Sequence, residues 1–213
     1  MTPALKICGI STIDALEAAI DARADCIGMV FFPPSPRHVE AGVARTLAMR
    51  ANDRIERVGL FVDADDGLIA EGIAAGQLDA VQLHGDEPPE RVGQIRNRFQ
   101  LPVWKAIPVK DAGDIAKADA YRDVADLLLF DARTPKDAAL PGGMGLRFDW
   151  SLLAPWKGLT GWGLAGGLTP SNAAQALQET GAPLLDTSSG VETAPGQKDP
   201  RLIADFCKAV RNA

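Results

Sequence analysis

Apolar residues in this chain gather into eight short runs that are spaced almost evenly along the sequence. Most runs begin 22 or 23 residues after the one before, and the two exceptions are 31 and 36 residues. Short apolar runs of this length, bounded by polar segments, are typical of buried strands in parallel sheets. The expected strands are 4–9, 26–32, 57–62, 79–84, 102–107, 125–131, 161–166 and 183–188.

Alanine-rich segments with helical spacing lie between these runs, for example at 13–22, 67–76 and 171–181. Strands that alternate with helices form parallel βαβ units. Eight such units favour an α/β fold that closes into a (β/α)8 (TIM) barrel, with residues 1–213 as a single domain. No G-x-G-x-x-G motif follows the first run, which weakens the alternative of an open, doubly wound sheet.

Two glycine turns follow the last two expected strands, at 163–170 (GLAGGLTP) and 186–192 (DTSSGVE). Turns of this kind present backbone N–H groups and small hydroxyls near helix N-termini, where they hold phosphate without a metal. In (β/α)8 barrels the loops after strands 7 and 8 form such a site. We therefore expect a phosphorylated small molecule to bind Gly166, Gly167, Ser188, Ser189 and Gly190.

The composition argues against several kinds of binding partner and cofactor. A net charge of −6 argues against a general nucleic-acid or membrane-surface binder, because both need a basic surface. The three cysteines are too few and too scattered for a disulfide framework or a zinc cluster, which favours a reducing, cytoplasmic location. No apolar run approaches the ~20 residues that span a bilayer. The two histidines and the acidic residues show no metal-ligand spacing, and we expect no metal and no cofactor.

Cys8 is the first candidate for chemistry, near the end of the first expected strand. Side chains alternate along a strand, so Lys6 and Cys8 share one face while Leu5 and Ile7 share the other. The apolar pair suits the helix-facing side, which leaves Lys6 and Cys8 inside the barrel. A neighbouring ammonium would lower the pKa of the thiol and make it a usable base. A buried, inert core cysteine is the alternative.

Two carboxylates end other expected strands. Asp131 follows four apolar residues and is a candidate general acid or base; its alternatives are a helix N-cap or a salt bridge to Lys6 or Lys105. Asp186 has the same alternatives, with substrate orientation favoured over proton transfer. Lys6 and Lys105 are expected to be inward-facing strand residues that form ion pairs.

Two further side chains lie where strands end or in the loops that follow. Arg37, in the long loop after the second strand, suits a bidentate pair with a substrate carboxylate. His84 ends the fourth strand and is either a hydrogen-bond donor in the site or a structural residue. A second long segment, 132–150, follows the sixth strand and is expected to be a lid or binding loop.

Motifs along the whole chain resemble those of the phosphoribosylanthranilate isomerase family. In order they are KICGI at 6–10, SPR at 35–37, GLFVD at 59–63, VQLHGDE at 81–87, LLFDA at 128–132, GGMGLRFDW at 142–150, GLAGGL at 163–168, DTSSGVE at 186–192 and GQKD at 196–199. The family usually has threonine where this chain has Met144, so a hydroxyl in the loop after the sixth strand is missing here.

The resemblance implies a cofactor-free Amadori rearrangement of N-(5-phospho-β-D-ribosyl)anthranilate in tryptophan biosynthesis. By motif, Cys8 is the general base, Asp131 is the general acid and Arg37 binds the anthranilate carboxylate. His84 and Asp186 are expected to contact the substrate.

Two alternatives stay open. One is a different phosphosugar barrel enzyme similar to indole-glycerol-phosphate synthase, and the other is a barrel that binds a phosphosugar without catalysis. The oligomeric state is left open between a monomer and a homodimer.

Overall fold

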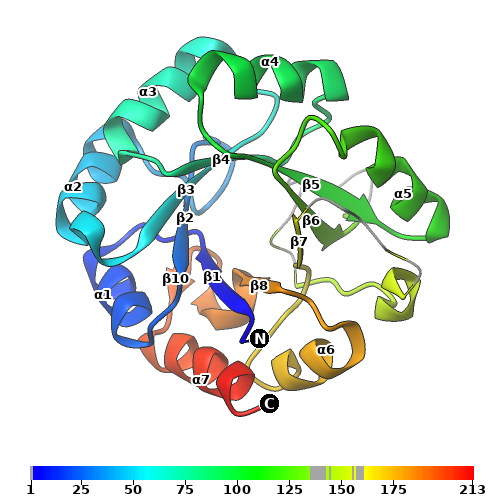
Figure 1. Cartoon of the computed structure of the whole chain (residues 1–213). Coiled ribbons are helices and arrows are strands. Elements are labelled where there is room, and N and C mark those ends of the chain that lie inside the picture. The colour runs from blue at the N-terminus through cyan, green and yellow to red at the C-terminus, as the bar shows by residue number, and fades with distance from the viewer. Residues whose placement is uncertain (1, 135–142, 144, 155, 157–160) are drawn as a thin grey trace.

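Eight parallel strands form a closed barrel in which each strand pairs with the next and β8 pairs with β1 (Figure 1). The computed structural model describes residues 2–134, 143, 145–154, 156 and 161–213. Each strand bound lies within two residues of the one expected from the sequence. The strands are β1 Ala4–Cys8, β2 Cys26–Val30, β3 Glu56–Phe61, β4 Ala80–Leu83, β5 Val103–Val109, β6 Leu127–Ala132, β7 Gly161–Leu164 and β8 Leu184–Thr187.

Helices form a ring around the barrel (Figure 1). They are α1 Ile13–Asp21, α2 Ala41–Ala51, α3 Asp66–Gly76, α4 Pro89–Phe99, α5 Ala112–Lys117, α6 Ala173–Thr180 and α7 Pro200–Arg211, with short 3-10 helices η1 Asn52–Arg54, η2 Ala118–Tyr121, η3 Trp150–Leu153 and η4 Ser189–Val191. Within the described residues, every helix is too short or too polar to span a bilayer.

The first βα unit shows why these residues fold in this way. The Thr12 hydroxyl accepts a hydrogen bond from the Ala15 amide and so caps the start of α1. Ala15, Leu16 and Ala19 form the buried face of that helix. They pack in one cluster with Leu5, as the alternating pattern of β1 predicts, so the apolar core lies between the barrel and the helices.

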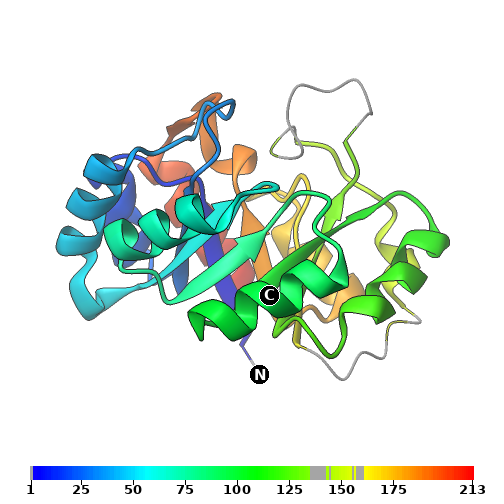
Figure 2. The ribbon, with the colours of Figure 1, turned by 90° about the horizontal axis from the view of Figure 1, so that it is seen from above.

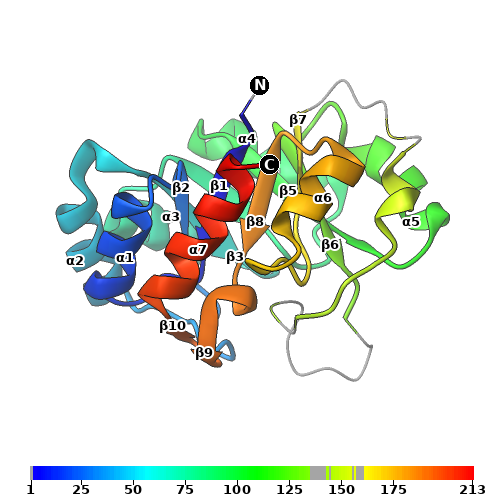
Figure 3. The same ribbon diagram turned by 90° about the horizontal axis from the view of Figure 1, so that it is seen from below.

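The closing pair of strands brings the two ends of the chain together. Lys6 of β1 lies in register with Asp186 of β8. After β8 and η4 the chain forms a hairpin of β9 (Glu192–Ala194) and β10 (Gln197–Lys198). Figures 2 and 3 show this hairpin at the opposite end of the barrel from the N-terminus, and Figure 2 shows it beside the loop after β2.

Candidate active site

An open cavity lies over the C-terminal ends of the strands, and nine of the ten site residues expected from the sequence line it. Those nine are Cys8, Arg37, His84, Asp131, Gly166, Gly167, Asp186, Ser188 and Ser189. The tenth, Gly190, is not part of the lining. A Cβ there would stand 1.8 Å from the carbonyl oxygen of Leu168, so this position has room only for glycine. Met144 lies outside the described residues.

Cys8 ends β1 inside the barrel, where it packs with Val30 and Leu60. Gly28 is its partner on β2, and a Cβ there would stand 2.7 Å from the Cys8 sulfur. Glycine at this position therefore makes the space that the thiol occupies. Burial raises the pKa of the Cys8 thiol, and the opposing charges of Lys6 and Lys198 do not offset it. The expectation of a lowered thiol pKa is wrong.

Lys6 has an ion-pair partner of its own in the fold. Its ammonium, which is fully buried, lies 2.8 Å from the Oδ2 atom of Asp186. Burial alone would lower the pKa of Lys6, but Asp186 more than compensates and raises it above its usual range. Lys6 still favours a thiolate at Cys8, but burial of the thiol outweighs this effect and the negative charge of Asp186 opposes it.

This arrangement predicts how Cys8 titrates in the ligand-free protein. An isolated cysteine has a pKa of about 8.5, and burial of Cys8 shifts that pKa upward. We expect the ultraviolet absorbance of the thiolate, taken as the difference between the native protein and Cys8→Ser, to appear only above that pH. Half-titration of Cys8 at or below the pH of an ordinary thiol would contradict the burial argument.

Asp131 ends β6 and its two oxygen atoms have different partners. Oδ1 accepts a hydrogen bond from the Ala132 amide at 2.8 Å, and Oδ2 lies 3.2 Å from Nε2 of His84. The other ring nitrogen of His84, Nδ1, lies 3.2 Å from the amide nitrogen of Gln82. With that amide donating to Nδ1, the ring proton is on Nε2, the ring nitrogen nearer to Asp131. His84 thus lies beside Asp131 in the cavity wall. Neither Lys6 nor Lys105 pairs with Asp131.

Sequence reasoning did not identify Gln82, which is fully buried and lines the cavity. It lies on β4, two residues before His84, which directly follows that strand. This spacing is the signal that places both side chains on one face. The Oε1 atom of Gln82 and the Oδ1 atom of Asp186 are both buried without a hydrogen-bond donor among the described residues. The cavity therefore offers two acceptors that a ligand hydroxyl can satisfy.

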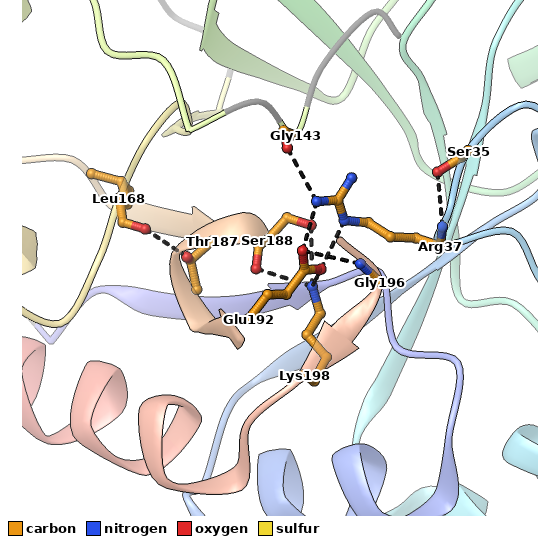
Figure 4. Close-up of polar contacts among 9 residues, drawn as sticks. All are labelled: Ser35, Arg37, Gly143, Leu168, Thr187, Ser188, Glu192, Gly196 and Lys198. Carbon is orange, nitrogen blue, oxygen red and sulfur yellow. Dashed lines mark hydrogen bonds and ion pairs between the residues drawn. The ribbon is translucent and has the colours of Figure 1, made fainter. Parts of the chain in front are cut away.

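Arg37 reaches the cavity from the loop after β2 and is 5% exposed. Its Nε and Nη2 atoms donate to the two oxygens of Glu192 at 2.8 and 2.7 Å, and Nη2 also donates to the Gly143 carbonyl at 3.1 Å (Figure 4). One bidentate edge of the guanidinium, which was expected to hold a ligand, is thus occupied by Glu192. Nη1 has no partner among the described residues and is the atom left for an anion.

The two glycine turns leave several backbone N–H groups unpaired at or next to the cavity wall. Gly166 and Gly167 have φ angles of +86° and +61°, and a Cβ on Gly166 would lie 2.6 Å from the Ala132 amide nitrogen. Both positions therefore require glycine. Within the described residues no acceptor takes the N–H groups of Gly166, Gly167, Ser189 or Gly190. The helix after Ser188 is the short η4, since the β9–β10 hairpin precedes α7. An α-helix N-terminus at that turn, as expected from the sequence, is not found.

Lys105 corrects another expectation. It does not point into the barrel, because it lies on the face of β5 opposite Trp104, which packs inside. Its ammonium lies 3.0 Å from Oε2 of Glu87 and 5.8 Å from the centre of the Tyr121 ring in η2. The expected ion pair is present, but it joins β5 to its neighbouring loop and helix layer. Within the described part of the chain, no three His, Cys, Asp or Glu side chains are grouped to hold a metal.

Comparisons with known proteins identify the family of this chain. The family model of N-(5'-phosphoribosyl)anthranilate (PRA) isomerase matches residues 5–209. The chain is 51% identical to the N-(5'-phosphoribosyl)anthranilate isomerase of Rhodopseudomonas palustris strain BisB5, over 99% of this chain and 97% of the relative. It is also 51% identical to the protein of that name from Paramagnetospirillum magneticum, over 97% and 96% of the two chains.

Solved structures also match the chain over almost its whole length. The crystal structure of phosphoribosyl anthranilate isomerase from Thermotoga maritima has a TM-score of 0.88 and 34% identity, and the match covers 99% of this chain and 100% of that one. A structure of the isomerase in complex with reduced 1-(o-carboxyphenylamino)-1-deoxyribulose 5-phosphate has a TM-score of 0.87 and 32% identity, with the same coverage. This chain therefore belongs to the phosphoribosylanthranilate isomerase family of (β/α)8-barrel enzymes.

Proposed function

We propose that this isomerase converts N-(5-phospho-β-D-ribosyl)anthranilate into 1-(2-carboxyphenylamino)-1-deoxyribulose 5-phosphate, a step of tryptophan biosynthesis, with Cys8 as general base and Asp131 as general acid. The observation that supports this most is their placement. The two side chains come from β1 and β6 and line one cavity with the glycine turns and Arg37. The ligand named for one similar structure is the reduced form of that product.

The reaction begins at the ring oxygen of the ribose. Asp131, in its acid form, donates a proton to that oxygen, and the bond from the oxygen to C1′ breaks with both electrons going to oxygen. The lone pair of the anthranilate nitrogen forms a double bond to C1′, which gives an iminium. His84 holds Asp131 in place through the contact at Oδ2.

Cys8 acts in the second step. Its thiolate removes the proton from C2′, the C–H electrons form the C1′–C2′ double bond, and the iminium electrons return to nitrogen. The enolamine that results loses its hydroxyl proton at O2′ and gains one at C1′, which gives the ketone. No oxidant or metal enters this balance, because the iminium is the electron sink. Its positive charge next to C2′ also favours the thiolate, which burial of Cys8 disfavours in the ligand-free protein.

Binding groups surround these two residues. We propose that Nη1 of Arg37 donates to the anthranilate carboxylate and that the free N–H groups at Gly166, Gly167, Ser189 and Gly190, with the hydroxyls of Ser188 and Ser189, hold the 5′-phosphate. The unpaired oxygens of Gln82 and Asp186 accept hydrogen bonds from ribose hydroxyls. Contacts far from C2′ supply the binding energy that orients the reacting carbon.

The assembly and location of the chain remain part of this proposal. We expect a monomer or a homodimer in the cytoplasm that binds a small phosphosugar and neither nucleic acid nor membrane. One similar structure is of monomers generated from the dimeric isomerase of Thermotoga maritima.

The test is turnover of freshly prepared phosphoribosylanthranilate, followed by the loss of its fluorescence. We expect the native protein to accelerate this loss and to form the deoxyribulose phosphate, identified by mass and chromatography. A Cys8→Ala, Asp131→Asn double variant, purified in parallel, controls for contaminating isomerase. Tight binding of the substrate without turnover would support the non-catalytic phosphosugar barrel instead, and a cyclised indole product would support the synthase alternative.

A further inference from the structure

Two charged residues of the β9–β10 hairpin lie behind the cavity wall, and neither the sequence motifs nor the proposed reaction gives them a role. The side chains of Glu192 and Lys198 are 3% and 1% exposed and do not line the cavity. They stand opposite each other in the hairpin. Charges buried to this extent are costly unless they are paired, so their contacts need an explanation.

The carboxylate of Glu192 is saturated with hydrogen bonds. Oε1 accepts from Arg37 and, at 2.6 Å, from Lys198, while Oε2 accepts from Arg37 and from the Gly196 amide at 3.2 Å. Figure 4 shows Arg37 and Lys198 reaching the carboxylate from two sides. Burial alone would raise the pKa of Glu192, but the two cations more than offset it and hold that pKa below its usual range. Glu192 is therefore an anion that fixes two cations.

Lys198 links Glu192 to Ser188, one of the residues proposed to bind the phosphate. Its ammonium donates to the Ser188 carbonyl at 3.0 Å, to the Ser188 hydroxyl at 3.2 Å and to Glu192 (Figure 4). All three ammonium hydrogens have an acceptor, so Lys198 has none left for a ligand. Because the Ser188 oxygen accepts from Lys198, its own hydrogen is free to donate into the cavity, and Ser188 lines that cavity.

A continuous chain of contacts therefore runs from Arg37 through Glu192 and Lys198 to Ser188. Its two ends are the groups that we assign to the substrate carboxylate and the substrate phosphate. The hairpin that carries the two middle residues is itself held in place, because Gly196 turns against the loop before Arg37, where a Cβ would stand 2.4 Å from the Pro36 carbonyl oxygen. Rigid support of this kind fixes the distance between binding groups.

We propose that Glu192 and Lys198 are positioning residues that hold Arg37 and Ser188 at a fixed separation, so that the site selects ligands carrying both a carboxylate and a phosphate. This inference rests on the proposed function and extends it from the groups that touch substrate to the pair that spaces them.

The direction in which one substitution changes substrate affinity separates positioning from simple charge attraction. Burial lowers the pKa of Lys198, and Glu192 opposes that shift. With Lys198 protonated, Arg37, Glu192 and Lys198 together carry a net charge of +1, and Glu192→Gln would raise it to +2. If the cluster acted only through its field, that change would tighten binding of an anionic substrate. If Glu192 positions its partners, binding weakens, because a carboxamide cannot accept hydrogen bonds from both cations on both of its ends.

The experiment compares Glu192→Gln, Glu192→Asp and Lys198→Met with the native enzyme. For each protein, kcat and KM are measured with phosphoribosylanthranilate, and Kd values for inorganic phosphate and for anthranilate are measured by calorimetry. Glu17→Gln is the matched control, since Glu17 also bridges two cations, Arg50 and Arg54, on the outer surface between α1 and α2. Melting temperatures identify any variant that has lost its fold.

We expect Glu192→Gln to raise KM and both Kd values by about tenfold or more, with a smaller change in kcat. Lys198→Met should weaken the binding of phosphate more than that of anthranilate, because it removes the two hydrogen bonds that Lys198 donates to Ser188. Glu17→Gln should change none of these values. An unchanged or lower KM in Glu192→Gln would overturn the proposal.

If Glu192→Gln does not fold, Glu192→Asp decides. It keeps the charge and shortens the side chain by one methylene, so native-like Kd values for both anions would also overturn the proposal. The Kd values do not depend on turnover. A native protein that binds both anions but does not isomerise the substrate would contradict the proposed function. The Kd values of the Glu192 variants would then still decide whether Glu192 positions its partners.

Discussion

Replacement of Cys8 by alanine is expected to lower kcat by about two to four orders of magnitude, the usual contribution of a general base. Cys8 is the only titratable group that β1 directs to the mouth of the barrel, because Lys6, two residues earlier, is held by Asp186 below it. KM should change little, since the groups proposed to bind the two anions come from other loops. Steady-state kinetics with phosphoribosylanthranilate measures both values.

Two further substitutions make this result specific. Cys207→Ala removes a buried thiol of α7, away from the cavity, and should leave kcat unchanged. Cys8→Ser keeps the shape of the side chain but supplies a much weaker base, so its kcat should be close to that of Cys8→Ala. A Cys8→Ala enzyme that isomerises at the native rate would exclude the thiol as the base.

The barrel could be predicted because each strand has the same simple pattern. In β1, Leu5 and Ile7 belong to the core outside the barrel while Cys8 packs inside it, as alternation requires. The same alternation turns Asp131 and Asp186, each the last residue but one of its strand, toward one cavity. Closure brings such strand ends together, so the order of motifs along the chain was enough to predict their meeting.

Charge interactions were harder to predict because they depend on partners that are distant in the sequence. Lys6 is a near neighbour of Cys8, and this suggested a lowered thiol pKa. Burial of the thiol outweighs the charge of Lys6, and the carboxylate of Asp186, 180 residues further along than Lys6, opposes that charge. Arg37 was expected to be free for a ligand carboxylate, yet Glu192 occupies one edge of its guanidinium. Local sequence shows which charges exist and not which pairs form.

The β9–β10 hairpin shows a second limit of prediction from the sequence. Glu192 and Lys198 lie within motifs that marked the family, but their shared position depends on the antiparallel pairing of two strands of three and two residues. Strands so short have no periodicity to detect. Gln82 is different, since its spacing of two residues from His84, which directly follows β4, was a usable signal.

Asp131→Asn is expected to lower kcat by about two to four orders of magnitude, because an amide cannot donate the proton that opens the ribose ring. The substitution preserves size and can still accept from the Ala132 amide. Beyond the lost proton, the substitution changes only the contact with His84. If the new NH2 group takes the place of Oδ2, it faces the Nε2–H group of His84, and two donors then oppose each other. We therefore expect KM to stay within a few-fold of the native value while kcat falls.

Asp126→Asn is the matched control for this prediction. Asp126 immediately precedes β6, at the end of the strand away from the cavity, where it accepts from the Val103 amide and pairs with Arg96. Its loss should lower the melting temperature without a comparable fall in kcat. The contrast between two aspartates at opposite ends of one strand tests whether the acid works through its place in the cavity. Native kcat in Asp131→Asn would show that the proton comes from another group, and His84, which lies 3.2 Å from Asp131, would be the first to examine.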